Sequence, residues 1–482
     1  MSLGPAPTAI RPGGAGSGGG DLAARGVSPA AGVMMPAMLR PRPTRSPASH
    51  AGGVRAAARS ARSSLGAPRT ARRASVALAL VLALAPACGD QAPGPTLVYE
   101  GEAGQPVAFQ LINGVPAIVA TIDEGAEQLL LVDTGSPLTL LSQRAFPERS
   151  AGTATVRLGA FGLAFPAAPI AMGALFASES PCAGPTPAGL VGGDLLQQFS
   201  LELDFGALQL ALAAGAPRPV PGGEAPALQE VPFRLRGGGT VRLGDDVKVR
   251  VGPSRVVVPL RVEGQPVEAL LDTGSTRTLI SDSLLRRLPA AGRPLICCET
   301  VETATQGALA ARVTRLRGIE LGTVQLADWA VLVLPEATPF AALSRETGRP
   351  ITMVIGSDVL QRLVSQLDYP ARRWRVGLRS DAPPAPVDAY LGPGFTFCAA
   401  RDGVGALVQD VLLGSDGFVK GVRTGERLLA IGGVDLAGLD RAAMLDLLQQ
   451  TPLGQAVRLK FSTAGGVIER TVRVEQLLPP FS

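Results

Sequence analysis

Histidine is almost absent from this sequence of 482 residues. The single histidine, His50, lies in an arginine-rich leader, so the remainder of the chain has none. This excludes Ser-His-Asp and Cys-His catalysis there, together with the usual histidine metal sites. Any catalysis must use carboxylates, Ser, Thr, Lys, Tyr or Cys, and we expect neither a metal nor a cofactor.

Cysteine is scarce, and no Cys-x-x-Cys spacing indicates a zinc or redox motif. The five cysteines are Cys88, Cys182, Cys297, Cys298 and Cys398. In an exported protein the last four are expected to form disulfides, with three possible connectivities. A bridge between adjacent residues is strained, so Cys297 and Cys298 are expected to pair with two separate partners.

Long hydrophobic runs are also missing. The most apolar stretch, residues 75–87, is too short to span a bilayer as a helix. Basic residues precede it and Cys88 follows it, an arrangement typical of an export signal. The sequence up to Cys88 resembles a bacterial lipobox, which implies a lipid anchor on Cys88 at the periplasmic or outer surface of the cell envelope. Plain secretion is the alternative. Residues 1–87 are thus expected to be a disordered leader and signal, and residues 88–104 a tether.

The basic balance of the chain comes from its leader. Residues 1–87 contain eleven arginines and one acidic residue, a net charge of +10, whereas the whole chain carries +5. The remainder therefore carries about −5, which removes support for a nucleic-acid partner.

An internal repeat is the strongest positive feature. Asp-Thr-Gly-Ser follows an apolar run at Asp133 and again at Asp272. Each motif has a later apolar-apolar-Gly, at Gly192 and Gly356, followed by an Asp-aromatic pair at the same distance in both copies. Such duplication indicates two copies of one structural unit, each mostly strands with one short helix. Asp194 and Asp358 are expected to cap that helix.

Two carboxylates held close together can activate water without histidine or metal. They cannot both ionise cheaply, so one proton is shared and one pKa rises. The hydroxyls of Thr134 and Thr273 can hydrogen-bond across the axis between the copies. Gly135 and Gly274 let the backbone turn tightly so that an N–H approaches the carboxylate. Ser136 and Ser275 are expected to bond the outer carboxylate oxygens.

Both copies resemble aspartic protease lobes of the retropepsin kind, in the two motifs at Asp133 and Asp272 and in the later Gly192 and Gly356. The resemblance implies two β lobes, residues 105–222 and 223–380, that form an intramolecular pseudo-dimer as in pepsins. It implies that Asp133 and Asp272 are the catalytic dyad and that the substrate is a polypeptide.

The copies are unequal. Gly192 follows Asp133 by 59 residues, but Gly356 follows Asp272 by 84, which is 25 more. The extra length falls where a flap or a specificity insertion would lie, and Gly307 is the best candidate for a flap tip. No tyrosine falls in a flap window, in contrast to pepsins. Pro137 follows the first motif, so an asymmetric dyad is expected.

The chain beyond the Pro-rich linker 381–388 resembles an α+β PDZ domain over residues 389–477. Gly392-Pro393-Gly394-Phe395 matches the carboxylate-binding loop, and the stretch 425–433 matches a second family motif. The resemblance implies that Gly392, Gly394 and Phe395 bind C-terminal peptides by strand addition. Pro393 removes one N–H from this loop.

Three functional interpretations remain. The first is an active envelope endopeptidase. The second is an inactive peptide-binding lipoprotein that keeps the protease fold. In the third, one lobe is structural and the working dyad forms between two chains.

Overall fold

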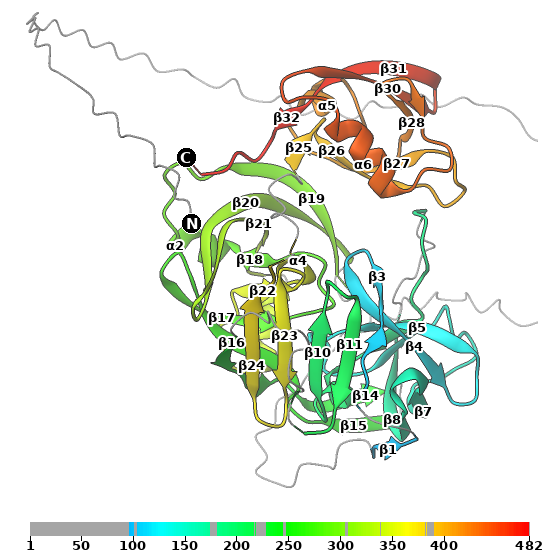
Figure 1. Cartoon of the computed structure of the whole chain (residues 1–482), viewed down its shortest axis with the longest axis vertical. Coiled ribbons are helices and arrows are strands. Elements are labelled where there is room, and N and C mark those ends of the chain that lie inside the picture. The colour runs from blue at the N-terminus through cyan, green and yellow to red at the C-terminus, as the bar shows by residue number, and fades with distance from the viewer. Residues whose placement is uncertain are drawn as a thin grey trace, which may run out of the picture. The chain divides into compact units, whose positions relative to one another are not determined.

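The computed structural model describes residues 96–481, apart from gaps at 101–103, 174–180, 216, 218–227, 244–246, 304–306, 338, 381 and 383–389. Strands dominate the described residues, which confirms the expected mostly β fold (Figure 1). The expected leader, the expected export signal and Cys88, the expected lipidation site, lie outside the described residues. Within the described ranges, no helix is long and apolar enough to cross a membrane.

The first copy of the repeat builds an eight-stranded sheet with the order β1-β8-β6-β9-β5-β4-β3, and β7 pairs with β4 and β8. Its elements are β1 (Val98–Tyr99), β3 (Gln110–Ile112), β4 (Val115–Ile122), β5 (Glu127–Val132), β6 (Leu140–Ser142), β7 (Gly152–Leu158), the 3₁₀ turn Gly159–Phe161, β8 (Leu163–Gly173), β9 (Gly189–Val191) and α1 (Gly193–Leu196).

The second copy builds another eight-stranded sheet, with the order β13-β16-β17-β22-β18-β21-β20-β19. Its elements are β13 (Arg234–Arg236), β16 (Arg255–Val262), β17 (Gln265–Leu271), β18 (Leu279–Ser281), α2 (Asp282–Arg287), β19 (Leu295–Thr303), β20 (Gly307–Leu321), β21 (Val324–Leu334), α3 (Pro339–Thr347), β22 (Met353–Ile355) and α4 (Ser357–Leu360). A separate hairpin pairs β14 (Gly239–Leu243) with β15 (Val247–Val251).

The two sheets repeat one topology. In the first copy, β5 ends before the Asp-Thr-Gly-Ser motif and pairs in parallel with β9, β9 pairs antiparallel with β6, and β6 pairs in parallel with β8. In the second copy, β17 ends before the motif and pairs in parallel with β22, β22 pairs antiparallel with β18, and β18 pairs in parallel with β21. The duplication in the sequence is therefore a duplication of strand order and direction.

The hairpin β19–β20 accounts for the unequal lengths. The end of β20 pairs with β16, with Val262 opposite Ile319, and β7 pairs with β4 in the same way, with Ile122 opposite Val156. β7 thus corresponds to the end of β20, and the described part of the first copy has no strand equivalent to β19. The extra length lies in a long hairpin, and residues 304–306 between its two strands fall outside the described residues.

A six-stranded sheet joins the copies, with the order β12-β24-β23-β10-β11-β2. Its strands are β2 (Val107–Ala108), β10 (Ser200–Asp204), β11 (Gln209–Ala213), β12 (Gln229–Pro232), β23 (Leu363–Asp368) and β24 (Arg373–Leu378). The two copies meet where Leu201 lies opposite Leu367. One buried apolar cluster contains residues of both copies, so their folding is coupled.

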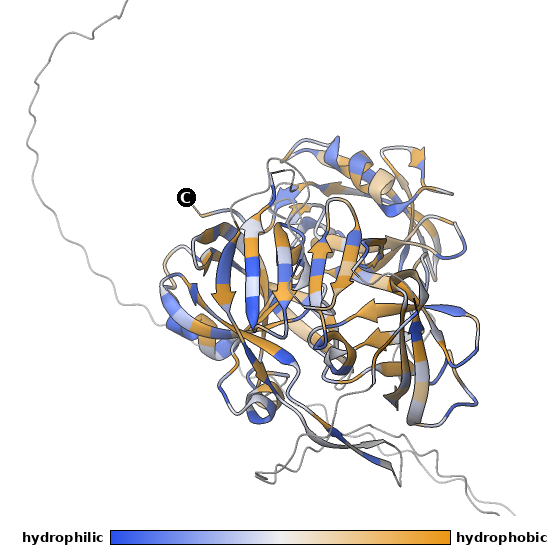
Figure 2. Cartoon of the chain, turned by 60° about the horizontal axis from the view of Figure 1, so that its bottom comes forward, coloured by the Kyte–Doolittle hydropathy of each residue, from blue (hydrophilic) through white to orange (hydrophobic). Residues whose placement is uncertain are grey.

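Alternation of polar and apolar residues explains why these segments form half-buried strands. Figure 2 shows hydrophobic and hydrophilic bands alternating along several strands. Along β16 and along β30 (Ala456–Thr463), exposed and buried side chains alternate over much of the strand. This period of two places one set of side chains in a core and the other in solvent.

The tail, residues 390–481, contains a sheet with the order β26-β27-β28-β30-β31 and β29 beside β28. Its remaining elements are β25 (Leu391–Gly392), β26 (Phe395–Ala399), β27 (Ala406–Val411), α5 (Asp416–Val419), β28 (Arg427–Ile431), β29 (Val434–Asp435), α6 (Arg441–Gln449), β31 (Gly466–Arg473) and β32 (Glu475–Gln476). The side chain of Asp440 caps α6 by accepting from the N–H of Ala443 at 2.8 Å, a role typical of aspartate at this position.

The disulfide pairing differs from the prediction for the adjacent cysteines. Cys182 of the first copy is bonded to Cys398 of the tail, across 216 residues of sequence. Cys297 and Cys298 are bonded to each other, so the expectation of two separate partners is wrong. Cys182 and Cys398 lie on neighbouring strand segments and form a disulfide with each other. Cys297 and Cys298 therefore have no other cysteine partner among the described residues.

Candidate active site

Two equivalent loops carry the aspartates. Asp133 directly follows β5 and Asp272 directly follows β17. The N–H of Asp133 donates to the carbonyl of Val191 at 3.0 Å, and the N–H of Asp272 donates to that of Ile355 at 3.0 Å. The apolar-apolar-Gly segment therefore lies beside each aspartate loop, as the resemblance implies.

The two threonines join the loops across the interface between the copies. The N–H of Thr134 donates to the hydroxyl of Thr273 at 3.0 Å, and the N–H of Thr273 donates to that of Thr134 at 3.1 Å. Each hydroxyl in turn donates to a carbonyl of the opposite copy, at 2.9 Å to Leu271 and 2.6 Å to Val132. Both threonines are fully buried. These four bonds fix the two loops against each other, in the arrangement predicted from the repeat.

The carboxyl groups of Asp133 and Asp272 lie against each other and share a side-chain hydrogen bond. Each also packs against the glycine of the other loop. A Cβ on Gly135 would lie 2.3 Å from Cγ of Asp272, and one on Gly274 would lie 2.5 Å from Cγ of Asp133. Glycine is required at both positions because any larger residue would displace the opposite carboxyl.

Backbone N–H groups hold each carboxylate in place. Oδ1 of Asp133 accepts from Gly135 at 2.8 Å and Ser136 at 2.9 Å. Oδ1 of Asp272 accepts from Gly274 at 2.9 Å and Ser275 at 3.1 Å. The loop that precedes Pro137 thus keeps the same bonds as its counterpart, so this proline introduces no difference here.

The serine hydroxyls do not bond the carboxylates, which corrects the prediction. Ser136 donates to the carbonyl of Leu138 at 2.7 Å, and Ser275 donates to that of Arg277 at 2.8 Å. Because the backbone N–H groups already reach the carboxylates, each hydroxyl is free to close the turn that follows.

Burial raises the pKa of both aspartates, and the charge of Asp133 raises the pKa of Asp272 further. The pKa of Asp133 is raised chiefly by burial, although the hydrogen bond with Asp272 opposes this. The pKa of Asp272 is raised further, by burial and by the charge of Asp133. The pair therefore retains one proton to higher pH than a free carboxyl would.

Arg255 is a charged neighbour of the dyad that the sequence analysis missed. Its charge lowers the pKa of both aspartates. Its guanidinium donates to the carbonyl of Gly135 and forms a two-pronged pair with Glu346 at 2.8 and 3.1 Å. Arg255 begins β16 and Glu346 belongs to α3, far from either motif in sequence. No sequence pattern would have paired them.

A protein family model and a solved structure are similar to parts of this chain. Residues 258–359, which contain Asp272, the β19–β20 hairpin and Gly356, match the aspartyl protease family model. The match supports an aspartic protease fold. The first copy lies outside the matched residues. No curated protein sequence matched the chain. The crystal structure of an aspartic proteinase from Irpex lacteus is similar over 59% of this chain and 99% of that chain, with 14% identity and a TM-score of 0.35.

Behind the dyad, the same network recurs in both copies of this protease-like site. The hydroxyl of Thr139 accepts from the N–H of Gly192 at 3.2 Å and donates to Asp194 at 2.9 Å. In the matched segment, the N–H of Gly356 donates to Thr278 at 3.1 Å, which donates to Asp358 at 2.7 Å. Thr139 and Thr278 were not predicted. Their identical offset from Asp133 and Asp272 was the available signal.

This network corrects the expected helix caps. The N-cap positions of α1 and α4 are Gly192 and Gly356, and Asp194 and Asp358 lie inside the first helical turn. Each aspartate is instead turned to its threonine partner. Burial raises the pKa of Asp194 to about 7.

The remaining predicted residues belong to other elements. Gly392, Gly394 and Phe395 belong to the tail, where Gly394 has a φ of +87° and its carbonyl accepts from Leu412 at 2.8 Å. Phe395 is buried in the tail core. Gly307 begins β20. Among the described residues, no group of three His, Cys, Asp or Glu is placed to hold a metal.

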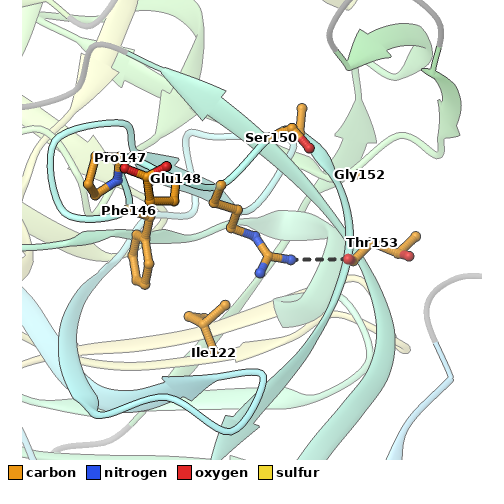
Figure 3. Close-up of a pocket in the computed structure, with 9 residues that line it drawn as sticks. Ile122, Phe146, Pro147, Glu148, Ser150, Gly152 and Thr153 are labelled. Atoms are coloured by element: carbon orange, nitrogen blue, oxygen red, sulfur yellow. Dashed lines mark hydrogen bonds between the residues drawn. The ribbon is translucent and has the colours of Figure 1, made fainter.

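A surface pocket lies in the segment of the first copy where the second copy has its long hairpin. Ile122, Phe146, Glu148, Ser150 and Thr153 are among the residues that line it (Figure 3). Arg149 also lines it and donates to the carbonyl of Thr153 at 3.1 Å, a bond drawn dashed at Thr153 in Figure 3. Neither aspartate of the dyad lines this pocket, so it is separate from the site.

Proposed function

We propose that this chain is an aspartic endopeptidase that hydrolyses peptide bonds with water activated by Asp133 and Asp272. The observation that carries the proposal is a pair of equivalent loops that are hydrogen-bonded to each other through Thr134 and Thr273. These loops hold two hydrogen-bonded carboxyls with raised pKa values. The aspartyl protease match over residues 258–359 supports it.

The proposed chemistry uses the one proton that the two aspartates share, which we place on Asp272. Ionised Asp133 takes a proton from water while the oxygen of that water attacks the scissile carbonyl carbon. Asp272 carries the shared proton and donates it toward the carbonyl oxygen, on which negative charge develops. The proton on Asp133 then passes to the leaving amine as the C–N bond breaks. The hydroxyl of the tetrahedral intermediate returns its proton to Asp272 as the carbonyl re-forms, so the pair again holds one proton.

We infer that the two copies act as lobes of an intramolecular pseudo-dimer, residues 105–222 and 223–380. The shared six-stranded sheet and the threonine bonds between the loops support this inference. The substrate would lie extended between the lobes, beside the β19–β20 hairpin. The tail is proposed to be a PDZ domain for substrate or partner peptides. Cys88 is proposed to carry a lipid anchor in the cell envelope.

The alternative is an inactive lipoprotein that keeps the fold and binds peptides. Incubation of the purified chain with unfolded protein at acidic pH separates the two. The endopeptidase produces fragments, and pepstatin suppresses them. Peptide binding with no fragments at any pH between 3 and 7, in protein shown to be folded, would support the inactive binder instead.

A further inference from the structure

The edge of the tail sheet is partly occupied by a segment of the first copy. β26 is the outer strand of that sheet and pairs on one side with β27. On its other side, Cys182 forms an antiparallel bridge with Ala400. The N–H of Ala183 donates to the carbonyl of Ala399 at 2.7 Å, and the N–H of Arg401 donates to that of Pro181 at 2.9 Å. Residues 181–183 thus extend the tail sheet in the manner of an added peptide strand.

A covalent bond holds this added segment. Cys182, in the middle of the segment, is bonded to Cys398 at the end of β26. The bond closes a loop of 216 residues, so it strongly favours the docked over the undocked arrangement. Arg401 adds a further bond from its guanidinium to the hydroxyl of Thr186 at 3.0 Å.

The same tail binds the long hairpin of the second copy. The N–H of Leu413 donates to the carbonyl of Cys297 in β19 at 2.6 Å, and the N–H of Thr300 donates to the carboxylate of Asp410 at 3.2 Å. Leu412 and Leu478 of the tail share a buried apolar cluster with residues of β20 and β21. The hairpin is therefore attached along its side and cannot move independently of the tail.

The tail also contacts the loop that carries Asp272. Arg277, five residues beyond that aspartate, donates to the hydroxyl of Tyr390 at 2.6 Å. The same guanidinium lies 3.5 Å from the carboxylate of Glu299 in β19. One side chain thus links the dyad loop, the hairpin and the tail.

From these contacts we propose that the tail is a strap, fixed to the first copy by residues 181–183 and to the hairpin of the second copy by β27, which restrains the two copies from opening around Asp133 and Asp272 until Cys182–Cys398 is reduced. The proposal rests on the proposed function only in taking the space between the copies as the substrate site. The internal strand takes the part of the β26 edge beyond Phe397 that an extended peptide ligand would use.

Release needs a dithiol, either a small molecule or a protein. One of its thiolates attacks a sulfur of the Cys182–Cys398 bond, which breaks as a mixed disulfide forms. The second thiol displaces the protein sulfur. The dithiol is oxidised to a disulfide, and Cys182 and Cys398 are reduced to thiols with the two protons. Residues 181–183 then keep only their hydrogen bonds to β26.

Hydrogen exchange of the folded full chain tests the strap without any need for activity. Dithiothreitol should speed exchange at Ala183 and Arg401 by about tenfold or more, and at Thr300 and Leu413 to a smaller extent. A Cys182→Ser/Cys398→Ser variant should exchange fast at these amides with or without dithiothreitol. A Cys297→Ser/Cys298→Ser variant, which keeps the strap bond, should still respond. Unchanged exchange at Ala183 and Arg401 after verified reduction would overturn the proposal, even if the double variant fails to fold.

Cleavage assays then test whether the strap limits the access of substrate to the dyad. Reduction should raise the rate on an unfolded protein severalfold more than the rate on a short peptide, and it should do so in the Cys297→Ser/Cys298→Ser variant too. Equal effects on both substrates would contradict a role in access. If reduction speeds hydrogen exchange but the protein cleaves no substrate in either the oxidised or the reduced state, the strap proposal stands and the proposed endopeptidase activity is refuted.

Discussion

Among single residues, Arg255 and Glu346 have the clearest influence on the dyad. The two side chains are mostly buried, with 13% and 11% of their surfaces exposed, so their charges are weakly screened. Arg255 lowers the pKa of both aspartates, while Glu346 partly offsets the charge of Arg255. The pair therefore sets the pH range over which the dyad holds one proton.

The pH profile of kcat/KM should shift in opposite directions when Arg255 and when Glu346 is replaced by a neutral residue. Arg255→Met removes the positive charge, so both limbs of the kcat/KM profile should move to higher pH, by roughly half a unit or more. Glu346→Gln leaves the arginine uncompensated, so both limbs should move to lower pH. The measurement is the pH dependence of peptide cleavage.

Arg234→Met is the matched control, because this arginine is 61% exposed and its loss changes the net charge equally. A profile that moves in the same direction for Arg255→Met and Glu346→Gln would contradict this electrostatic account.

Asp194 gives a second prediction, for stability. Burial raises its pKa from 3.8 to about 7, so the folded state binds more protons than the unfolded state between these values. The contribution of the Asp194 carboxyl to the free energy of unfolding is fully present below pH 3.8 and is lost as the pH rises toward 7. Asp194→Asn, neutral at every pH, should gain on the order of 4 kcal/mol relative to wild type between pH 4 and 7.5.

Urea unfolding at the two pH values measures this difference. Exposed Asp446→Asn provides the control and should change stability equally at both. If Asp194→Asn keeps the same offset from wild type at both pH values, Asp194 is ionised throughout and the assignment fails.

At the scale of elements, the close packing of the aspartate loop on the strand that ends at Val191 is the feature most sensitive to side-chain size. A Cβ on Gly192 would lie 2.2 Å from the carbonyl oxygen of Leu138. Gly192→Ala should therefore cost about 2 kcal/mol or more of unfolding free energy and reduce activity, because the loop must move. Gly152→Ala, whose Cβ would have no neighbour within 4 Å, should change stability by less than about 0.5 kcal/mol. Equal midpoints in denaturant titrations of both variants would refute the role of this contact.

Elements and contacts specified by local or repeated patterns were predictable. The duplicated motifs predicted the threonine bonds across the copies, and the tail strands and the Asp440 cap follow from alternation and capping. Contacts specified by tertiary structure were not. The Arg255–Glu346 pair joins a strand and a helix distant in sequence, and the Ser136 hydroxyl was assigned to a carboxylate that backbone N–H groups already satisfy. The bond between Cys297 and Cys298 depends on where Cys182 and Cys398 lie.

At the scale of the whole molecule, the site depends on both copies at once. Neither aspartate loop is complete alone, because the hydroxyl of each threonine bonds the other loop. The shared sheet and common core hold the copies in one chain together. The structure thus favours a dyad within one chain over a dyad formed between two chains.

The most direct test of the dyad measures cleavage of unfolded protein by Asp133→Asn, by Asp272→Asn and by an equimolar mixture of the two. Each variant should lose at least about a thousandfold in kcat, since no other described group can supply the missing carboxylate. Both should keep the wild-type unfolding midpoint within a few degrees. The mixture should stay inactive, because each chain holds both halves of its own site. Activity retained by either variant, or restored in the mixture, would contradict a dyad of Asp133 and Asp272 within one chain.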